Sequence, residues 1–223
     1  MSQENKLYQG AAGVVDVMLD YPEIEPKGWA VVLHPHPLYE GTRDNKVVTT
    51  ISRLLVQQGY VVLRPNFRGV GKSEGVFDEA VGETQDMLLV VQQFLAENPQ
   101  FAELPWLISG FSFGSAVAAL LHQEVVDLID RGAEQSGLTV PSALILAGVG
   151  VWRFNYRELR LPENTFVIHG GADEVIPLAD AFEWLAMYRQ PVTVLPNVGH
   201  FFHGALIELR KQLELYLKGL DLI

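Results

Sequence analysis

Residues 106–119 read WLISGFSFGSAVAA, and the interpretation of the whole chain starts from them. The first four residues form a short apolar run, which is typical of a strand covered on both faces, and the last five open a helix of small residues. Between them stands the pentapeptide Gly110-Phe111-Ser112-Phe113-Gly114, a G-x-S-x-G pattern. Because the two glycines lack bulk, the helix can start close to the strand and the turn can raise the Ser112 hydroxyl above the sheet. This context predicts a nucleophile elbow.

The same alternation of strands and helices extends to both sides of this segment. It predicts strands at 13–20, 29–33, 60–64, 143–147, 165–169 and 192–195, and helices at 45–58, 83–98, 179–188 and 205–217. Strands that alternate with helices indicate right-handed crossovers and a mainly parallel sheet flanked by helices. The partly alternating segment 13–20 is expected at an edge of that sheet, and the polar segment 131–141 on the surface. We expect one α/β domain over residues 1–223.

Composition excludes several classes of protein. Hydrophobic residues make up 48% and charged residues 19% of the 223 residues, which suits a globular chain with a substantial core. A formal net charge of −11 repels nucleic acid and anionic membrane surfaces, so we expect neither as a partner. The absence of cysteine excludes disulfides, thiolate metal sites and a cysteine nucleophile. With a polar N-terminus and no long apolar run, the protein is expected to be cytoplasmic, while its oligomeric state stays open.

A serine nucleophile needs a base, and the base needs an acid that orients it. The best acid is Asp173, which follows the predicted strand 165–169 and therefore lies at the carboxyl edge of the sheet; its neighbour Glu174 is the alternative. The best base is His200, in the loop between the last strand and the last helix, and His203 is a second candidate.

An oxyanion hole requires two N–H donors near the serine. The N–H of Phe113, the residue after the serine, supplies the first. The second is expected in the loop after strand 29–33, where residues 34–41 read HPHPLYEG. Because the two prolines have no N–H, the nearest donors are His36 and Leu38, and we prefer Leu38.

Several segments together carry a resemblance to a known superfamily. GFSFG (110–114), HGGADEVIP (169–177), GHFFHG (199–204) and RPNFRGVGKSEG (64–75) all resemble segments of α/β-hydrolases. HPHP (34–37) followed by GTRDNK (41–46) is similar to small bacterial predicted hydrolases that are distantly similar to dienelactone hydrolase. The order serine, acid, histidine in the chain is the order of that superfamily. Dienelactone hydrolases proper use a cysteine, which this chain lacks.

Many relatives insert a helical lid before the strand that carries the acid. Here only residues 148–164 separate the predicted strands 143–147 and 165–169, which is too short for a lid domain. We therefore expect the α/β-hydrolase fold without an inserted lid, and an open, shallow site.

Three further patterns have simpler interpretations. Residues 69–73 (GVGKS) lack the first glycine of a P-loop, because Asn66 occupies that place. The histidines at 34, 36 and 169 lack the spacing of a metal site and are interpreted as histidines that shape loops. The pair Phe201-Phe202 is interpreted as core packing. We expect no cofactor and no metal.

The resemblance implies a serine hydrolase that cleaves carboxylic esters of small molecules. Ser112, His200 and Asp173 would form its catalytic triad, and the reaction would pass through an acyl-enzyme. Two alternatives stay open at this point. One is an acyltransferase or amidase with the same triad, and the other is a catalytically silent binding protein on the same fold.

Overall fold

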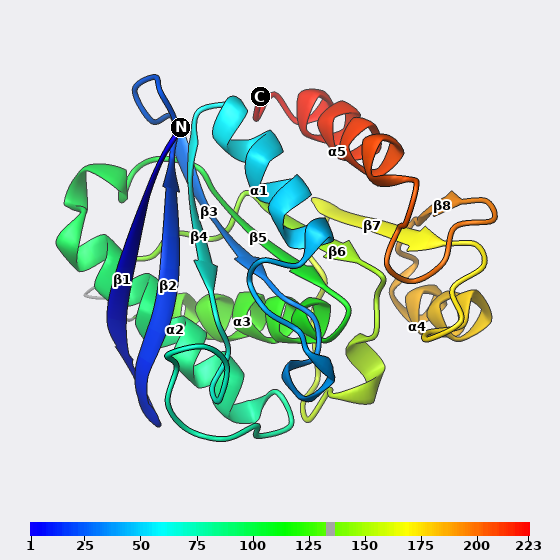
Figure 1. Cartoon of the computed structure of the whole chain (residues 1–223), viewed down its shortest axis with the longest axis horizontal. Coiled ribbons are helices and arrows are strands. Elements are labelled where there is room, and N and C mark those ends of the chain that lie inside the picture. The colour runs from blue at the N-terminus through cyan, green and yellow to red at the C-terminus, as the bar shows by residue number, and fades with distance from the viewer. Residues whose placement is uncertain (133–136) are drawn as a thin grey trace.

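The computed structural model describes residues 1–132 and 137–223, and within them eight strands form one sheet (Figure 1). The strands are β1 (Ser2–Gly10), β2 (Gly13–Tyr21), β3 (Gly28–Leu33), β4 (Tyr60–Pro65), β5 (Trp106–Phe111), β6 (Ala143–Ala147), β7 (Thr165–Gly170) and β8 (Thr193–Leu195). Their order is β1-β2-β4-β3-β5-β6-β7-β8. The pairs β1–β2 and β2–β4 are antiparallel and the others are parallel. The predicted mainly parallel α/β fold is confirmed.

Helices cover both faces of the sheet. They are α1 (Lys46–Gln57), α2 (Val81–Glu97), α3 (Phe113–Asp130), α4 (Leu178–Tyr188) and α5 (Leu206–Gly219). The apolar side chains of α1 and α5 pack in one core cluster, and those of α2, α3 and α4 pack in another. The side chains of β3 alternate between the two faces of the sheet. Ala30 and Val32 pack in the cluster of α1 and α5, and Trp29, Val31 and Leu33 pack in the cluster of α2, α3 and α4. This two-sided burial explains why the central strands read as unbroken apolar runs.

The N-terminal strand β1 is absent from the sequence-based prediction. Most of its residues are exposed, including Leu7, and of its side chains only Tyr8 is buried, so no alternating pattern signals a strand. It is held by antiparallel pairing along the whole of β2. The expectation that residues 13–20 form an edge strand is therefore wrong, because β2 lies between β1 and β4.

The segment between β6 and β7 contains no inserted domain. Residues 148–164 hold one short 3₁₀ turn, Val151–Arg153, and bury Val149, Val151 and Leu159 in the core. The carboxyl ends of the parallel strands are therefore not covered by a lid from this segment. Part of the predicted surface segment 131–141 lies outside the described residues.

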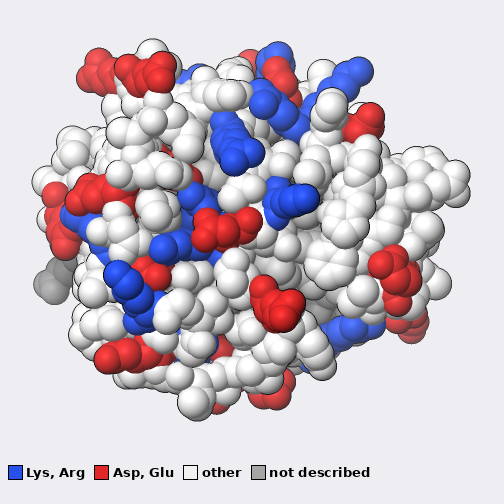
Figure 2. Space-filling view, viewed as in Figure 1, with Lys and Arg blue, Asp and Glu red and all other residues white. Residues whose placement is uncertain are grey.

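The surface carries mixed charges. On the face in Figure 2, acidic and basic side chains are interspersed, although Asp and Glu outnumber Lys and Arg by 27 to 16 in the whole chain. Among the described residues, no helix is long and apolar enough to cross a membrane.

Candidate active site

Ser112 stands in a strained turn between β5 and α3. Its φ of 56° and ψ of −120° lie in a region that residues with a side chain rarely adopt. Glycines on both sides make the turn possible: a Cβ at Gly110 would lie 1.9 Å from the carbonyl oxygen of Gly114. The Ser112 N–H donates to the carbonyl of Ala147 at 2.9 Å, which ties the turn to β6. The predicted strand–turn–helix arrangement is present.

Two consecutive hydrogen bonds connect Ser112 to His200 and His200 to Asp173. The Oγ of Ser112 lies 2.9 Å from Nε2 of His200, and Nδ1 of His200 lies 2.7 Å from Oδ2 of Asp173. Asp173 stands in the loop between β7 and α4, and His200 in the loop between β8 and α5. All three side chains are buried. The structure thus brings together the three residues that the sequence analysis selected.

Asp173 is held by donors on both carboxylate oxygens. Oδ1 accepts the N–H groups of Val175 at 2.9 Å and Ile176 at 2.8 Å, while Oδ2 faces His200. Burial raises the pKa of this carboxyl, but the hydrogen bonds from His200 and from the two backbone N–H groups outweigh it, so that the pKa is lowered. Asp173 is therefore a carboxylate at neutral pH, fixed in position for the imidazole.

Glu174 and His203, the sequence-based alternatives, lie elsewhere. The Glu174 side chain is exposed, and its Oε2 faces the backbone N–H of His200 at 3.4 Å rather than the imidazole. His203 is also exposed, and its ring stacks on Phe201 with 5.8 Å between ring centroids. Neither side chain is hydrogen-bonded to Ser112.

Two other histidines are buried and hold backbone groups. Nδ1 of His34 donates to the carbonyl of Pro35 at 2.6 Å, and its Nε2 accepts the N–H of Phe67 at 2.9 Å. Burial lowers the pKa of His34 to about 3, so that the ring is neutral. His169 likewise accepts the Val149 N–H at Nδ1 and faces the carbonyl of Ile176 with Nε2. These contacts agree with the interpretation that both histidines shape loops.

The residues predicted to supply the oxyanion donors belong to two neighbouring elements. Phe113 is the first residue of α3, where backbone N–H groups have no partner within the helix and the helix dipole favours negative charge. In the loop after β3, the structure does not support Leu38 as the second donor. A 3₁₀ turn over Pro37–Tyr39 directs the Leu38 N–H to Nδ1 of His36 at 3.2 Å, and the Leu38 side chain is 66% exposed. Of the two candidates, His36 is the one that lies at the site.

A cavity of about 600 Å³ opens beside Ser112 and His200. Its lining mixes apolar, polar and charged groups and consists of Pro35, His36, Tyr39, Glu40, Gly41, Asn45, Ser112, Arg153, Val175, His200 and Phe201. Phe201 and Phe202 differ in their surroundings. Phe202 is fully buried, whereas Phe201 lines the cavity with 40% of its surface exposed. The interpretation of both as core packing is therefore wrong for Phe201.

Eight of these eleven lining residues were not selected as site residues from the sequence, among them Tyr39, Asn45 and Arg153. Tyr39 and Asn45 follow the segment HPHP, and Arg153 stands in the short turn Val151–Arg153 between β6 and β7. Their place at the site depends on how loops fold, and a single sequence carries no pattern for it.

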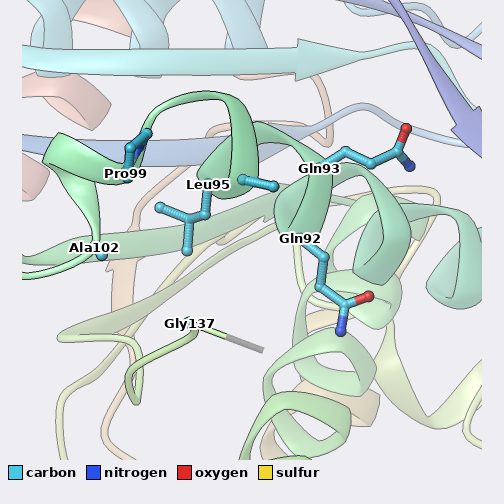
Figure 3. Close-up of a pocket in the computed structure, with 7 residues that line it drawn as sticks. Gln92, Gln93, Leu95, Pro99, Ala102 and Gly137 are labelled. Carbon is cyan, nitrogen blue, oxygen red and sulfur yellow. The ribbon is translucent and has the colours of Figure 1, made fainter. Parts of the chain in front are cut away.

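A second cavity, of about 440 Å³, is shown in Figure 3. It is formed near the end of α2 and the segment that leads into β5, and its lining consists of Gln92, Gln93, Leu95, Ala96, Pro99, Ala102 and Gly137. None of these lining residues is titratable, so this cavity offers no acid or base.

Comparisons with known proteins identify relatives of this chain. Residues 14–125, about half of the chain, match the family of X-Pro dipeptidyl-peptidases (S15 family). The uncharacterized protein RP471 of Rickettsia prowazekii is 51% identical over 196 residues, which cover 84% of this chain and 77% of that protein.

Two solved structures cover nearly the whole chain. XC6422 from Xanthomonas campestris, a serine hydrolase without a lid, is 30% identical with a TM-score of 0.83 and covers 98% of this chain and 94% of its own. An α/β serine hydrolase homologue from Coxiella burnetii is 33% identical with a TM-score of 0.79 and covers 96% of each chain. The chain therefore belongs to the α/β serine hydrolases without a lid.

Proposed function

We propose that this protein hydrolyses carboxylic esters of small molecules through a catalytic triad of Ser112, His200 and Asp173. The observation that carries the proposal is the chain of two hydrogen bonds, 2.9 Å and 2.7 Å long, from the Ser112 hydroxyl to the Asp173 carboxylate. The strained turn at Ser112 and the adjoining cavity support the same assignment.

The proposed reaction has two steps. Nε2 of His200 takes the Ser112 proton as Oγ attacks the ester carbonyl, and the collapse of the tetrahedral intermediate transfers that proton to the departing alcohol. Water then attacks the acyl-enzyme with His200 again as base, which releases the acid and restores Ser112. Throughout, Asp173 stays ionised and orients the imidazole through Nδ1.

The tetrahedral intermediate carries a negative oxygen that needs preorganised donors. We assign them to the backbone N–H groups of Phe113 and His36. The first stands at the positive end of α3, and the second belongs to a residue that lines the cavity together with Ser112.

Amide cleavage is the second candidate, favoured by the match to the X-Pro dipeptidyl-peptidase family. That match ends at residue 125, so it includes Ser112 but neither Asp173 nor His200. Initial rates on p-nitrophenyl acetate and on matched p-nitroanilides separate the two candidates. We expect turnover of the ester and none of the anilides above the Ser112→Ala background, and anilide turnover that depends on Ser112 would favour the amidase.

Paired substitutions test the triad. We expect His200→Ala and Asp173→Asn to lower kcat/KM by roughly 10³-fold or more. His200→Ala removes both hydrogen bonds of the triad, and Asp173→Asn removes the carboxylate that orients the imidazole. The matched controls His203→Ala and Glu174→Gln alter exposed neighbours in the same two loops and should change kcat/KM less than about tenfold. A larger loss in His203→Ala than in His200→Ala contradicts the assignment of the base.

A further inference from the structure

His169 is a buried side chain that the mechanism above does not use. It lies near the end of β7, four residues before Asp173, and none of its surface is exposed. Its Nε2 is 2.9 Å from the carbonyl oxygen of Ile176 and 3.2 Å from Oδ2 of Asp173. The second of these contacts places a further histidine against the carboxylate of the proposed triad.

The backbone fixes which nitrogen of His169 carries the proton. The N–H of Val149 donates to Nδ1 at 3.2 Å, so Nδ1 is an acceptor and the proton of the neutral ring is on Nε2. Burial lowers the pKa of His169, which keeps the ring neutral. Nε2–H is therefore a donor shared between the carbonyl of Ile176 and Oδ2 of Asp173.

Oδ2 of Asp173 thus faces two imidazoles. His200 approaches it with Nδ1 at 2.7 Å, and His169 with Nε2 at 3.2 Å. A carboxylate oxygen that accepts a second hydrogen bond is less basic and holds a cationic partner less strongly.

We propose that His169 is a positioning residue that shares Oδ2 of Asp173 with His200 and so limits how strongly the carboxylate retains the His200 imidazolium. This inference rests on the proposed function, because it assigns His200 as the base. A base that is held too strongly in its protonated form is unavailable to take the serine proton near neutral pH. His169 would therefore widen the pH range of activity toward acid.

Loss of the His169 donor should not release Asp173. Oδ1 keeps its two bonds to the N–H groups of Val175 and Ile176, at 2.9 and 2.8 Å, so the carboxylate retains its orientation. Substitution at residue 169 should then strengthen the contact between Asp173 and His200 rather than break it.

Other charged and titratable groups face His200 and stay the same in every variant below. Glu174 contacts its backbone N–H, and His36, Tyr39, Glu40 and Arg153 line the cavity on which His200 opens. On His169 itself, the titratable groups that act are Asp173 and His200.

Titration of the His200 ring by NMR in substrate-free protein tests the proposal. His169→Phe keeps a flat ring but removes the Nε2–H donor to Asp173. We expect the midpoint of the His200 titration to rise by roughly half a pH unit to one unit relative to wild type. His169→Gln retains an N–H donor and should give a smaller rise. The acid limb of kcat/KM should move in the same direction and by a similar amount.

His34→Phe is the matched control. His34 is equally buried and also holds two backbone groups through its ring nitrogens, but its hydrogen bonds join Pro35 and Phe67 rather than Asp173. It should lower stability to a similar degree without moving the His200 midpoint. A midpoint in His169→Phe that is unchanged or lowered overturns the proposal, and so does an equal rise in His34→Phe.

A measurement on the wild type covers the case in which His169→Phe does not fold. Ring ¹⁵N shifts should identify His169 as the neutral tautomer protonated on Nε2, and the tautomer protonated on Nδ1 would overturn the proposal. Because these titrations use no substrate, they remain decisive for His169 even if the protein hydrolyses no ester.

Discussion

Gly114 lies so close to Leu33 that a Cβ at residue 114 would stand 2.5 Å from the Leu33 carbonyl oxygen. This approach seats the start of α3 on the end of β3. It brings the strained Ser112 turn beside the loop that begins at His34 and supplies the proposed second oxyanion donor. The close approach of these two backbones therefore fixes the Ser112 turn relative to the loop after β3.

We predict that Gly114→Ala destabilises the protein by about 2–4 kcal/mol, because the methyl group would meet backbone atoms that cannot move aside cheaply. Denaturant unfolding measures the effect. Gly219→Ala is the control, since a Cβ there meets nothing within 4 Å at the end of α5. It should leave stability unchanged or slightly higher. Equal effects of the two substitutions would show that the contact has no energetic consequence.

The conformation of Ser112 leads to a second prediction. At φ 56° and ψ −120°, a glycine is not strained, whereas any residue with a Cβ is. Ser112→Gly should therefore be more stable than Ser112→Ala by about 1 kcal/mol, although both lack the hydroxyl and should be inactive. Unfolding curves of the two variants give the difference directly. A more stable alanine variant would mean that this turn holds no strain.

Much of the fold could be predicted from the sequence because the central strands and the helices bury apolar side chains in regular patterns. The segments WLIS and SAVAA predict β5 and α3. In the structure β5 continues to Phe111 and α3 begins at Phe113, so that both elements reach Ser112. β1 could not be predicted in this way, because backbone pairing with β2 holds it while most of its side chains face solvent.

The residues of the candidate site likewise differ in whether the sequence could predict them. Ser112, Asp173 and His200 could be selected because each stands at a fixed place relative to a strand end. The second oxyanion donor could not, since a local 3₁₀ turn directs the Leu38 N–H to the His36 ring. The exposure of Phe201 likewise depends on a loop in which Phe202 takes a φ of 53° and turns into the core.

Buried histidines should make the fold sensitive to acid. Burial lowers the pKa of His34 to about 3 and that of His122 to about 4. Between about pH 6.5 and pH 4 the unfolded chain binds protons at these side chains and the folded chain does not, so the free energy of unfolding falls as the pH is lowered. The expected slope is about 1.4 kcal/mol per pH unit for each histidine.

His122→Leu tests this slope. Among the described residues, neither ring nitrogen of His122 has a hydrogen-bond partner, so an apolar replacement loses no bond there. Unfolding measured at pH 6.5, 5.5 and 4.5 should give a slope smaller than that of wild type by about 1.4 kcal/mol per pH unit. An unchanged slope would mean that His122 takes up its proton in the folded state.

The absence of a lid over the 600 Å³ cavity predicts a preference for short acyl chains. Methylenes beyond the cavity would remain in water and would forgo about 0.8 kcal/mol of binding each. Across p-nitrophenyl esters from acetate to palmitate, kcat/KM should therefore level off or fall beyond medium chain lengths. A steady rise beyond about eight carbons, at the transfer free energy per methylene, would reveal a deep acyl tunnel.

The central claim, that Ser112 is an activated nucleophile, is tested most directly by covalent labelling with a fluorophosphonate and mass spectrometry of the intact protein and its peptides. A serine oxygen displaces fluoride from such a reagent only when a base and an oxyanion hole assist it. We predict one label per folded chain, located on the peptide that contains Ser112, and none on Ser112→Ala or on denatured protein. Equal labelling of Ser112→Ala, or ester hydrolysis by a folded wild type that takes up no label, would contradict the account.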